Sequence, residues 1–172
     1  MLGAPLTLVE YVDLQCPYCQ QFETQAMPTL IARFVRTGTV KIEARPIAFI
    51  GPDSQQGRGA AIAAGQQGKL FNFMQILYLN HGTENSGWLT NGVIVSAAGS
   101  IPGLDVPRLL ADRSSAAVKA QAAANDRQAT ADNVQATPTI LVGKSGGTLR
   151  PVTLTSPTDE QSVAAAINRA AR

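Results

Sequence analysis

The chain is poor in the residues that build metal sites and in long apolar runs. Its 172 residues include two cysteines and one histidine, whereas a zinc site takes four ligands, so we predict no metal site. No apolar run approaches the roughly 20 residues that a helix needs to cross a membrane. Charged residues make up 15% of the chain, and the net charge of +2 comes without a basic cluster. Nucleic acid is therefore not expected as a partner.

A signal peptide is also missing, because residues 1–5 lead directly into a strand-like segment. The chain is then either cytosolic or lacks an export or anchor segment that once preceded it. The cysteine count does not separate these alternatives, since both thiols belong to one motif. A length of 172 residues fits one well-buried core, with room for a sub-domain.

The two cysteines form the motif Cys16-Pro17-Tyr18-Cys19. Residues 6–12 are rich in β-branched and aromatic side chains and read as a strand, whereas apolar residues recur at helical spacing from residue 22 onward. Cys16 therefore lies where a helix begins, and Pro17 suits the first helical position. The free backbone N–H groups and the dipole of such a helix end favour a thiolate.

The spacing also separates the roles of the two sulfurs. Cys19 lies one helical turn after Cys16 on the same face and within reach of it. We predict an exposed attacking Cys16 and a more buried resolving Cys19, which form mixed disulfides with a substrate. No cofactor is expected beyond this redox-active disulfide.

Three other interpretations of the pair stay open. A structural disulfide would close a very small loop and restrict the unfolded chain little. A zinc half-site would have to recruit His81, the only histidine. A chance pair of buried cysteines is the third alternative, and the position between a strand and a helix disfavours it.

The remaining pattern predicts the order of elements. A second strand is expected over residues 39–50, helices over 54–132, two strands around a turn at 144–147, and a final helix over 159–172. A βαβ unit joined to a ββα unit is the thioredoxin-type α/β topology. We therefore predict a thioredoxin-like domain of residues 1–53 and 133–172, and a helical insertion sub-domain of residues 54–132.

Three segments carry a resemblance to a known family. They are residues 10–22 (EYVDLQCPYCQQF), 80–90 (NHGTENSGWLT) and 136–142 (ATPTILV). With them, the whole chain resembles the DsbA-like thioredoxin-fold family of extracytoplasmic thiol-disulfide oxidoreductases. The long separation of Cys19 from Pro138 favours this branch over a minimal thioredoxin or glutaredoxin. The resemblance implies an oxidase of extracytoplasmic proteins whose export or anchor segment is absent from this chain.

The resemblance also implies roles for individual residues. Cys16 corresponds to the nucleophile and Cys19 to the resolving cysteine. Glu10, six residues before Cys16, corresponds to a buried acid beneath the disulfide that could relay a proton to Cys19. Strand alternation alone also allows Glu10 to face outward.

On the other side of the disulfide, the resemblance implies a substrate-binding region. Pro138 corresponds to a cis-proline that faces the disulfide, although an ordinary trans turn is the alternative. The backbone of Thr137 could pair with an extended substrate. Pro17 and Tyr18 are further candidates for substrate contact, and an apolar groove near Cys16 could use Tyr18, Leu14 and Phe49.

Two departures from the family pattern leave the direction of electron flow open. Tyr18 stands where strongly oxidising members carry a histidine, and Thr137 before the proline is similar to isomerases and reductase-like members. A reductase or isomerase is therefore one alternative, and a non-catalytic metal- or peptide-binding module is another. The expected partners are client proteins with free or mis-paired cysteines and a membrane or soluble redox partner, and we expect a monomer.

Overall fold

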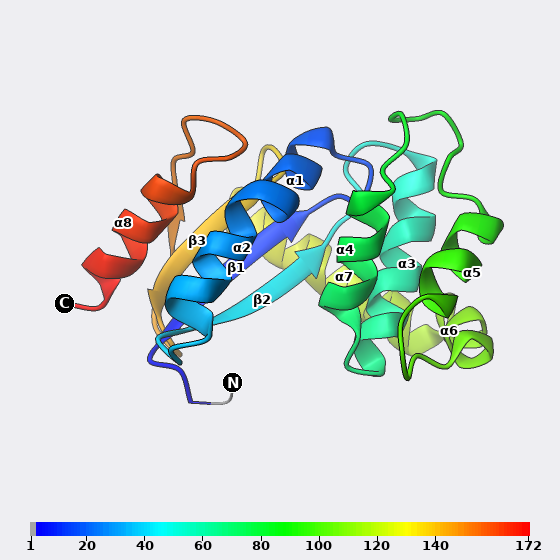
Figure 1. The fold of residues 1–172 in the computed structure, drawn as a ribbon, viewed down its shortest axis with the longest axis horizontal. Helices are drawn as coiled ribbons and strands as arrows, with labels where there is room; N and C mark the ends of the chain where they lie inside the picture. The colour runs from blue at the N-terminus through cyan, green and yellow to red at the C-terminus, as the bar shows by residue number, and fades with distance from the viewer. Residues whose placement is uncertain (1–2) are drawn as a thin grey trace.

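The structure, a computed structural model, describes residues 3–172 and is built around a mixed four-stranded sheet (Figure 1). The strands are β1 (Leu6–Val12), β2 (Val40–Pro46), β3 (Thr139–Lys144) and β4 (Arg150–Val152), in the spatial order β2-β1-β3-β4. β2 runs parallel to β1, whereas β3 is antiparallel to β1, and β4 to β3. The predicted order of a βαβ unit followed by a ββα unit is confirmed.

A continuous helical stretch joins β1 to β2. It consists of α1 (Pro17–Gln21), η1 (Phe22–Ala26), α2 (Met27–Leu30) and η2 (Ile31–Val35). The segments η1 and η2 are π-helical, a wider turn that often occurs at functional sites. The apolar residues predicted to form its inner face, Phe22 and Leu30 among them, are buried against the sheet. Their spacing explains why this stretch is helical and why it covers that face.

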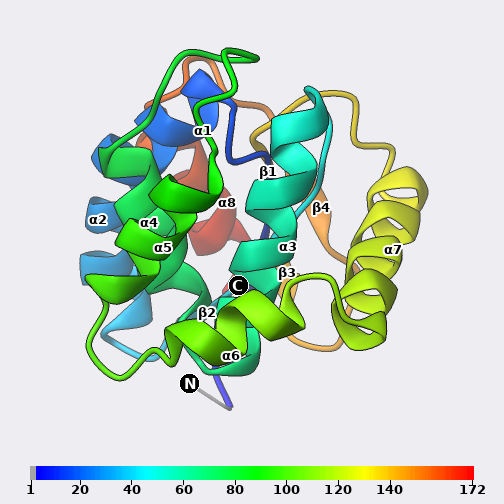
Figure 2. The same cartoon turned by 90° about the vertical axis from the view of Figure 1, so that its right-hand side faces the viewer.

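Five helices separate β2 from β3, and the first four of them stand beside the sheet (Figure 2). They are α3 (Pro52–Gln66), α4 (Leu70–Leu79), α5 (Asn91–Gly99), α6 (Val106–Asp112) and α7 (Ala116–Ala131). Among residues 3–172, no helix has the length and apolarity to cross a membrane. The division of the chain at residues 54 and 133 into two units stays a prediction.

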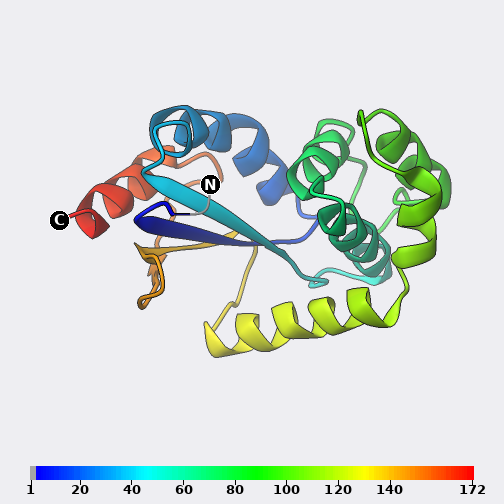
Figure 3. The same cartoon turned by 90° about the horizontal axis from the view of Figure 1, so that it is seen from below.

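Helices cover both faces of the sheet (Figure 3). The stretch from α1 to η2 and the final helix α8 (Glu160–Ala170) lie on one face, and α7 lies on the other. Hydrogen bonds of Tyr11 on β1 connect the end of α7 to the sheet. The Tyr11 hydroxyl donates to Oδ2 of Asp132, the C-cap residue of α7, at 2.6 Å and accepts from Arg45 Nη1 at 2.7 Å. Burial and the bond to Asp132 raise the pKa of Tyr11 to about 12, so its hydroxyl stays protonated.

The second strand is shorter than predicted. It ends at Pro46, so the predicted strand was wrong for residues 47–50. Pro46 has no N–H, and Asp13 Oδ2 accepts the backbone N–H groups of Phe49 at 2.7 Å and Ile50 at 2.9 Å. These bonds turn the chain away from the sheet and bring the segment after β2 next to the loop that precedes Cys16.

Candidate active site

Cys16 is the N-cap residue of the helix that begins with α1. Its backbone is extended, and its sulfur accepts a hydrogen bond from the N–H of Cys19 at a donor–acceptor distance of 3.4 Å. Sulfur thus occupies the place that a serine or aspartate oxygen usually takes at a helix start. Both cysteines are free thiols in the structure. The helix start consequently holds the two sulfurs together and aims backbone N–H groups at Cys16.

The environments of the two sulfurs shift their pKa values in opposite directions. A hydrogen bond from the Cys19 side chain is the largest cause that lowers the pKa of Cys16, from 9.0 to about 6, and Thr137 and backbone N–H groups add to it. Burial opposes this shift. For Cys19, burial first, and then the hydrogen bond and charge of Cys16, raise the pKa well above 9.0. At neutral pH the pair therefore holds one thiolate, on Cys16, and one thiol, on Cys19.

Cys16 is less exposed than predicted. Its exposed fraction is 4%, so the expectation of a sulfur exposed at the helix tip was wrong. The reason is the segment before β3, which covers it: in the thiol form of Cys16, Sγ donates to the carbonyl oxygen of Thr137 at 3.2 Å. Thr137 is buried, and the peptide bond between Thr137 and Pro138 is cis. Residues 121 positions apart in the chain thus meet at the sulfur.

The proposed surface residues divide into two groups. Pro17 is exposed, and so are Tyr18 and Phe49, with exposed fractions of 57% and 54%. Leu14 is buried at 1% exposure, so its prediction as a groove residue was wrong. Leu14 belongs instead to the core shared by the cysteines and the helices after β2. Within residues 3–172, the hydroxyl of Tyr18 forms no hydrogen bond with Cys16 Sγ, whereas the backbone N–H of Tyr18 helps to lower the pKa of Cys16.

Glu10 lies on the face of β1 that is covered by the helix after Cys16. Its side chain is fully buried, because β1 alternates and Leu8 and Val12 on the same face join the cores beneath the helices. Within residues 3–172, neither oxygen of Glu10 receives a hydrogen bond from an N–H or hydroxyl group. Burial, and then the charge and hydrogen bond of Glu23, raise the pKa of Glu10 well above 4.5.

Glu23 is the second member of this buried carboxyl pair. It lies in η1, four residues after Cys19, and its Oε1 is likewise buried without a donor among the described residues. Burial raises its pKa, too. The pKa values of both carboxyl groups are thus raised by burial, and helical spacing from Cys19 could have indicated Glu23 in the sequence.

Asp13 organises the loop that leads into Cys16. Besides its bonds to the segment after β2, its Oδ1 accepts from Gln15 N at 2.9 Å, and its carbonyl oxygen accepts from Cys16 N at 3.0 Å and from Tyr78 Oη at 3.1 Å. Tyr78 comes from α4 and is fully buried. Gln15 donates to Ser54 Oγ at 3.0 Å in α3. The helices after β2 therefore fix the dithiol loop, which sequence spacing could not show.

Two other features lie apart from this chemistry. The ring of His81 lies 5.1 Å from that of Trp88 and 6.3 Å from that of Tyr78, so it packs in an aromatic group. Residues 3–172 contain no group of three potential metal-ligating side chains.

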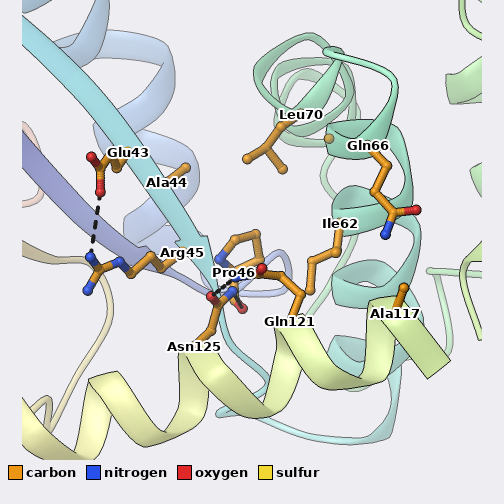
Figure 4. A pocket seen from close by; sticks show the side chains of 11 residues that line it. Glu43, Ala44, Arg45, Pro46, Ile62, Gln66, Leu70, Ala117, Gln121 and Asn125 are labelled. Atoms are coloured by element: carbon orange, nitrogen blue, oxygen red, sulfur yellow. Dashed lines mark hydrogen bonds and ion pairs between the residues drawn. The ribbon is translucent and has the colours of Figure 1, made fainter. Parts of the chain in front are cut away.

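A pocket of about 560 Å³ opens at the outer edge of β2, between α3 and α7 (Figure 4). Neither cysteine nor any other predicted site residue lines it.

A family model described as Thioredoxin matches residues 2–148. The chain belongs to the thioredoxin family. Its sequence is 28% identical over 142 residues to the Bacillus cereus protein named "Probable disulfide bond formation protein D", and 28% identical over 144 residues to the Bacillus subtilis "Disulfide bond formation protein D". Each alignment covers 81% of this chain and 66% or 64% of the relative, so the chain spans just under two thirds of their length.

Solved structures show the same fold. Oxidised BdbD from Bacillus subtilis superposes with a TM-score of 0.85 at 22% identity, over 99% of this chain and 90% of that one. DsbA from Chlamydia trachomatis gives 0.80 at 20% identity, over 98% and 88%. At such identities the likeness concerns the fold alone. Together with the family match, these neighbours confirm a DsbA-like thioredoxin fold.

Proposed function

We propose that the protein is a thiol-disulfide oxidoreductase that exchanges disulfides with client proteins through Cys16 and Cys19. The observation that carries this proposal is the position of Cys16 at a helix start, where its sulfur accepts the N–H of Cys19. This geometry accompanies opposite pKa shifts, lowered for Cys16 and raised for Cys19. Similarity to proteins named for disulfide bond formation supports it. A structural disulfide or a chance pair would not need this asymmetry.

The reaction can be written from these residues. In the oxidised protein, a client thiolate attacks Cys16 Sγ, the disulfide breaks, and its electron pair leaves on Cys19. A second client thiolate then attacks the client sulfur of the mixed disulfide, and Cys16 leaves as a thiolate. The disulfide has moved to the client, and the protein holds two electrons more. Cys19 takes up a proton, for which the buried pair Glu10 and Glu23 is the proposed source.

We propose that electrons flow from the client to the protein, as in an oxidase. A lowered pKa of Cys16 stabilises the reduced state, and dithiols with a stabilised reduced state are oxidants. The alternative is a reductase or an isomerase, because a threonine before the proline, as at Thr137, is similar to the pattern in isomerases and reductase-like members. Equilibration with glutathione separates them: an oxidase has a potential well above that of thioredoxin, and a reductase has one close to it.

Client binding is proposed to use the surface around Cys16. The exposed aromatic side chains of Tyr18 and Phe49 offer apolar contact, and the backbone of Thr137 is proposed to pair with an extended client segment. Pro138 and Pro17 would lie next to Cys16 Sγ at this surface. An extracytoplasmic compartment suits this function because disulfides persist there. The compartment, the membrane or soluble redox partner and the monomeric state stay predictions.

Single cysteine variants test the proposal. Cys16→Ser is expected to abolish the oxidation of a model dithiol peptide, whereas Cys19→Ser should trap mixed disulfides that accumulate on a non-reducing gel. The two variants remove one sulfur each, so they control for one another. Wild-type exchange by Cys16→Ser would disprove the assigned nucleophile. Absence of exchange in the wild type, with bound metal, would instead indicate the non-catalytic module.

A further inference from the structure

A groove with an unusual charge lies between β3, β4 and α8. Its volume is about 600 Å³, and four basic residues but no acidic residue line it. These are Lys144, Arg150, Arg169 and Arg172. The whole chain has 14 basic and 12 acidic residues. Four cations without a carboxylate therefore stand out in a chain whose charges are otherwise nearly balanced.

The charges in the groove are not neutralised within the described part of the chain. No ion pair or side-chain hydrogen bond among residues 3–172 involves Lys144, Arg150 or Arg169, although five ion pairs form elsewhere. Arg169 lies in the last turn of α8, where the helix dipole stabilises a cation. That effect does not apply to Lys144 and Arg150, which are on strands. Three cations that form no ion pair within the described residues, Lys144, Arg150 and Arg169, therefore line the groove.

The groove lies at the end of the sheet opposite to the dithiol. β1 runs from Leu6 toward Cys16, and Leu6 pairs with Lys144 at the far end of β3. Five residue steps along β3 separate Lys144 from Thr139, a distance of about 17 Å. Figure 1 shows the C-terminal end of α8 well away from the start of α1. A partner bound in the groove would leave Cys16 accessible to a client.

We propose that this cationic groove binds the surface of a bilayer that contains anionic phospholipids. Three exposed, flexible cations at an open rim can each approach a different phosphate, and together they suit a surface with many anionic groups. The small apolar residues between them, Pro151, Ala166 and Ala170, allow close approach to the interfacial region. Bound in this way, the protein would hold its dithiol away from the membrane.

Two features of the groove disfavour other anionic partners. A dedicated site for a free phosphate would enclose it with buried donors, whereas these side chains are exposed. A nucleic acid duplex would be contacted along a longer basic stripe.

Vesicle binding tests the proposal with the 172-residue chain. Wild type is expected to bind vesicles of equal phosphatidylglycerol and phosphatidylcholine, and to release as salt is raised, but not to bind pure phosphatidylcholine. Lys144→Gln, Arg150→Gln and Arg169→Gln combined should weaken binding by about 100-fold, at about tenfold or less per charge. The matched control combines Arg36→Gln, Lys119→Gln and Arg127→Gln, which removes the same charge from exposed sites elsewhere.

Each outcome has a definite meaning. Retained binding by the control and lost binding by the groove variant support the proposal. Equal loss in both variants would show a non-specific effect of net charge and overturn it, as would wild-type protein that ignores anionic vesicles. If inorganic phosphate binds saturably and displaces the vesicles, the ligand of the groove is a small anion, and the membrane proposal is overturned. If the triple variant fails to fold, Arg150→Gln alone should still weaken binding by about fivefold.

Discussion

Replacing Cys19 by alanine removes the group that does most to lower the pKa of Cys16. A hydrogen bond to a charged group contributes about 1.5–3 kcal/mol, and one pKa unit corresponds to about 1.36 kcal/mol. Loss of the Cys19 S–H should therefore raise the pKa of Cys16 by about 1–2 units. From a starting value of about 6, the reduced variant would titrate between about 7 and 8.

The assay follows the ultraviolet absorbance of the thiolate as a function of pH. In Cys19→Ala the only thiol is Cys16, so the titration has a single midpoint. Wild type should show its first midpoint at about 6, because the pKa of Cys19 is raised well above 9.0. An alkylation rate at one pH is a poor substitute, since a thiolate with a higher pKa is also more nucleophilic and the two effects offset each other.

Cys19→Ser is the matched control for this experiment. Its hydroxyl keeps a donor near Cys16 Sγ while it removes the same sulfur, so the low pKa of Cys16 should largely persist. Equal midpoints in Cys19→Ala and Cys19→Ser would refute the claim that a donor at position 19 stabilises the thiolate. A wild-type midpoint close to 9 would refute the assignment of a helix-stabilised thiolate altogether.

Three further predictions concern stability. Because the pKa of reduced Cys16 falls from 9.0 unfolded to about 6 folded, wild type should gain stability over Cys16→Ser as pH rises from 6 to 9 and lose that gain as pH falls through 6. The gain should be less than about 3 kcal/mol at pH 8, and a pH-independent difference in denaturant unfolding would contradict it. Because the pKa of Glu10 is raised, the free energy of unfolding of wild type should fall as pH rises above about 4.5. The free energy of unfolding of Glu10→Gln should fall less. Parallel pH profiles of the two proteins would argue against a buried acid. Tyr78→Phe removes the bond to the carbonyl of Asp13 and should lower the free energy of unfolding by about 1 kcal/mol, and an unchanged thermal midpoint would show that this bond contributes nothing.

Several parts of the fold follow from local patterns. The β-branched and aromatic composition of residues 6–12 and the helical spacing from Phe22 predicted the first two elements. The turn at 144–147 was predicted from its paired glycines, and the final helix from its amphipathic spacing. The end of β2 was not predicted, because it depends on Asp13. Asp13 lies 36 residues before Phe49 and accepts a hydrogen bond from the backbone N–H of Phe49.

The sequence by itself determined that two sulfurs lie one turn apart at a helix start, because spacing of three and a strand-to-helix change are local properties. Tertiary structure decided how the surroundings and the pKa values of the two sulfurs differ. Thr137 meets Cys16 from 121 positions away, and Tyr78 fixes the preceding loop from α4. Burial between the helix after Cys16 and its neighbours raises the pKa values of Cys19, Glu10 and Glu23. Burial and long-range hydrogen bonds depend on how distant segments pack, and no local pattern encodes that packing.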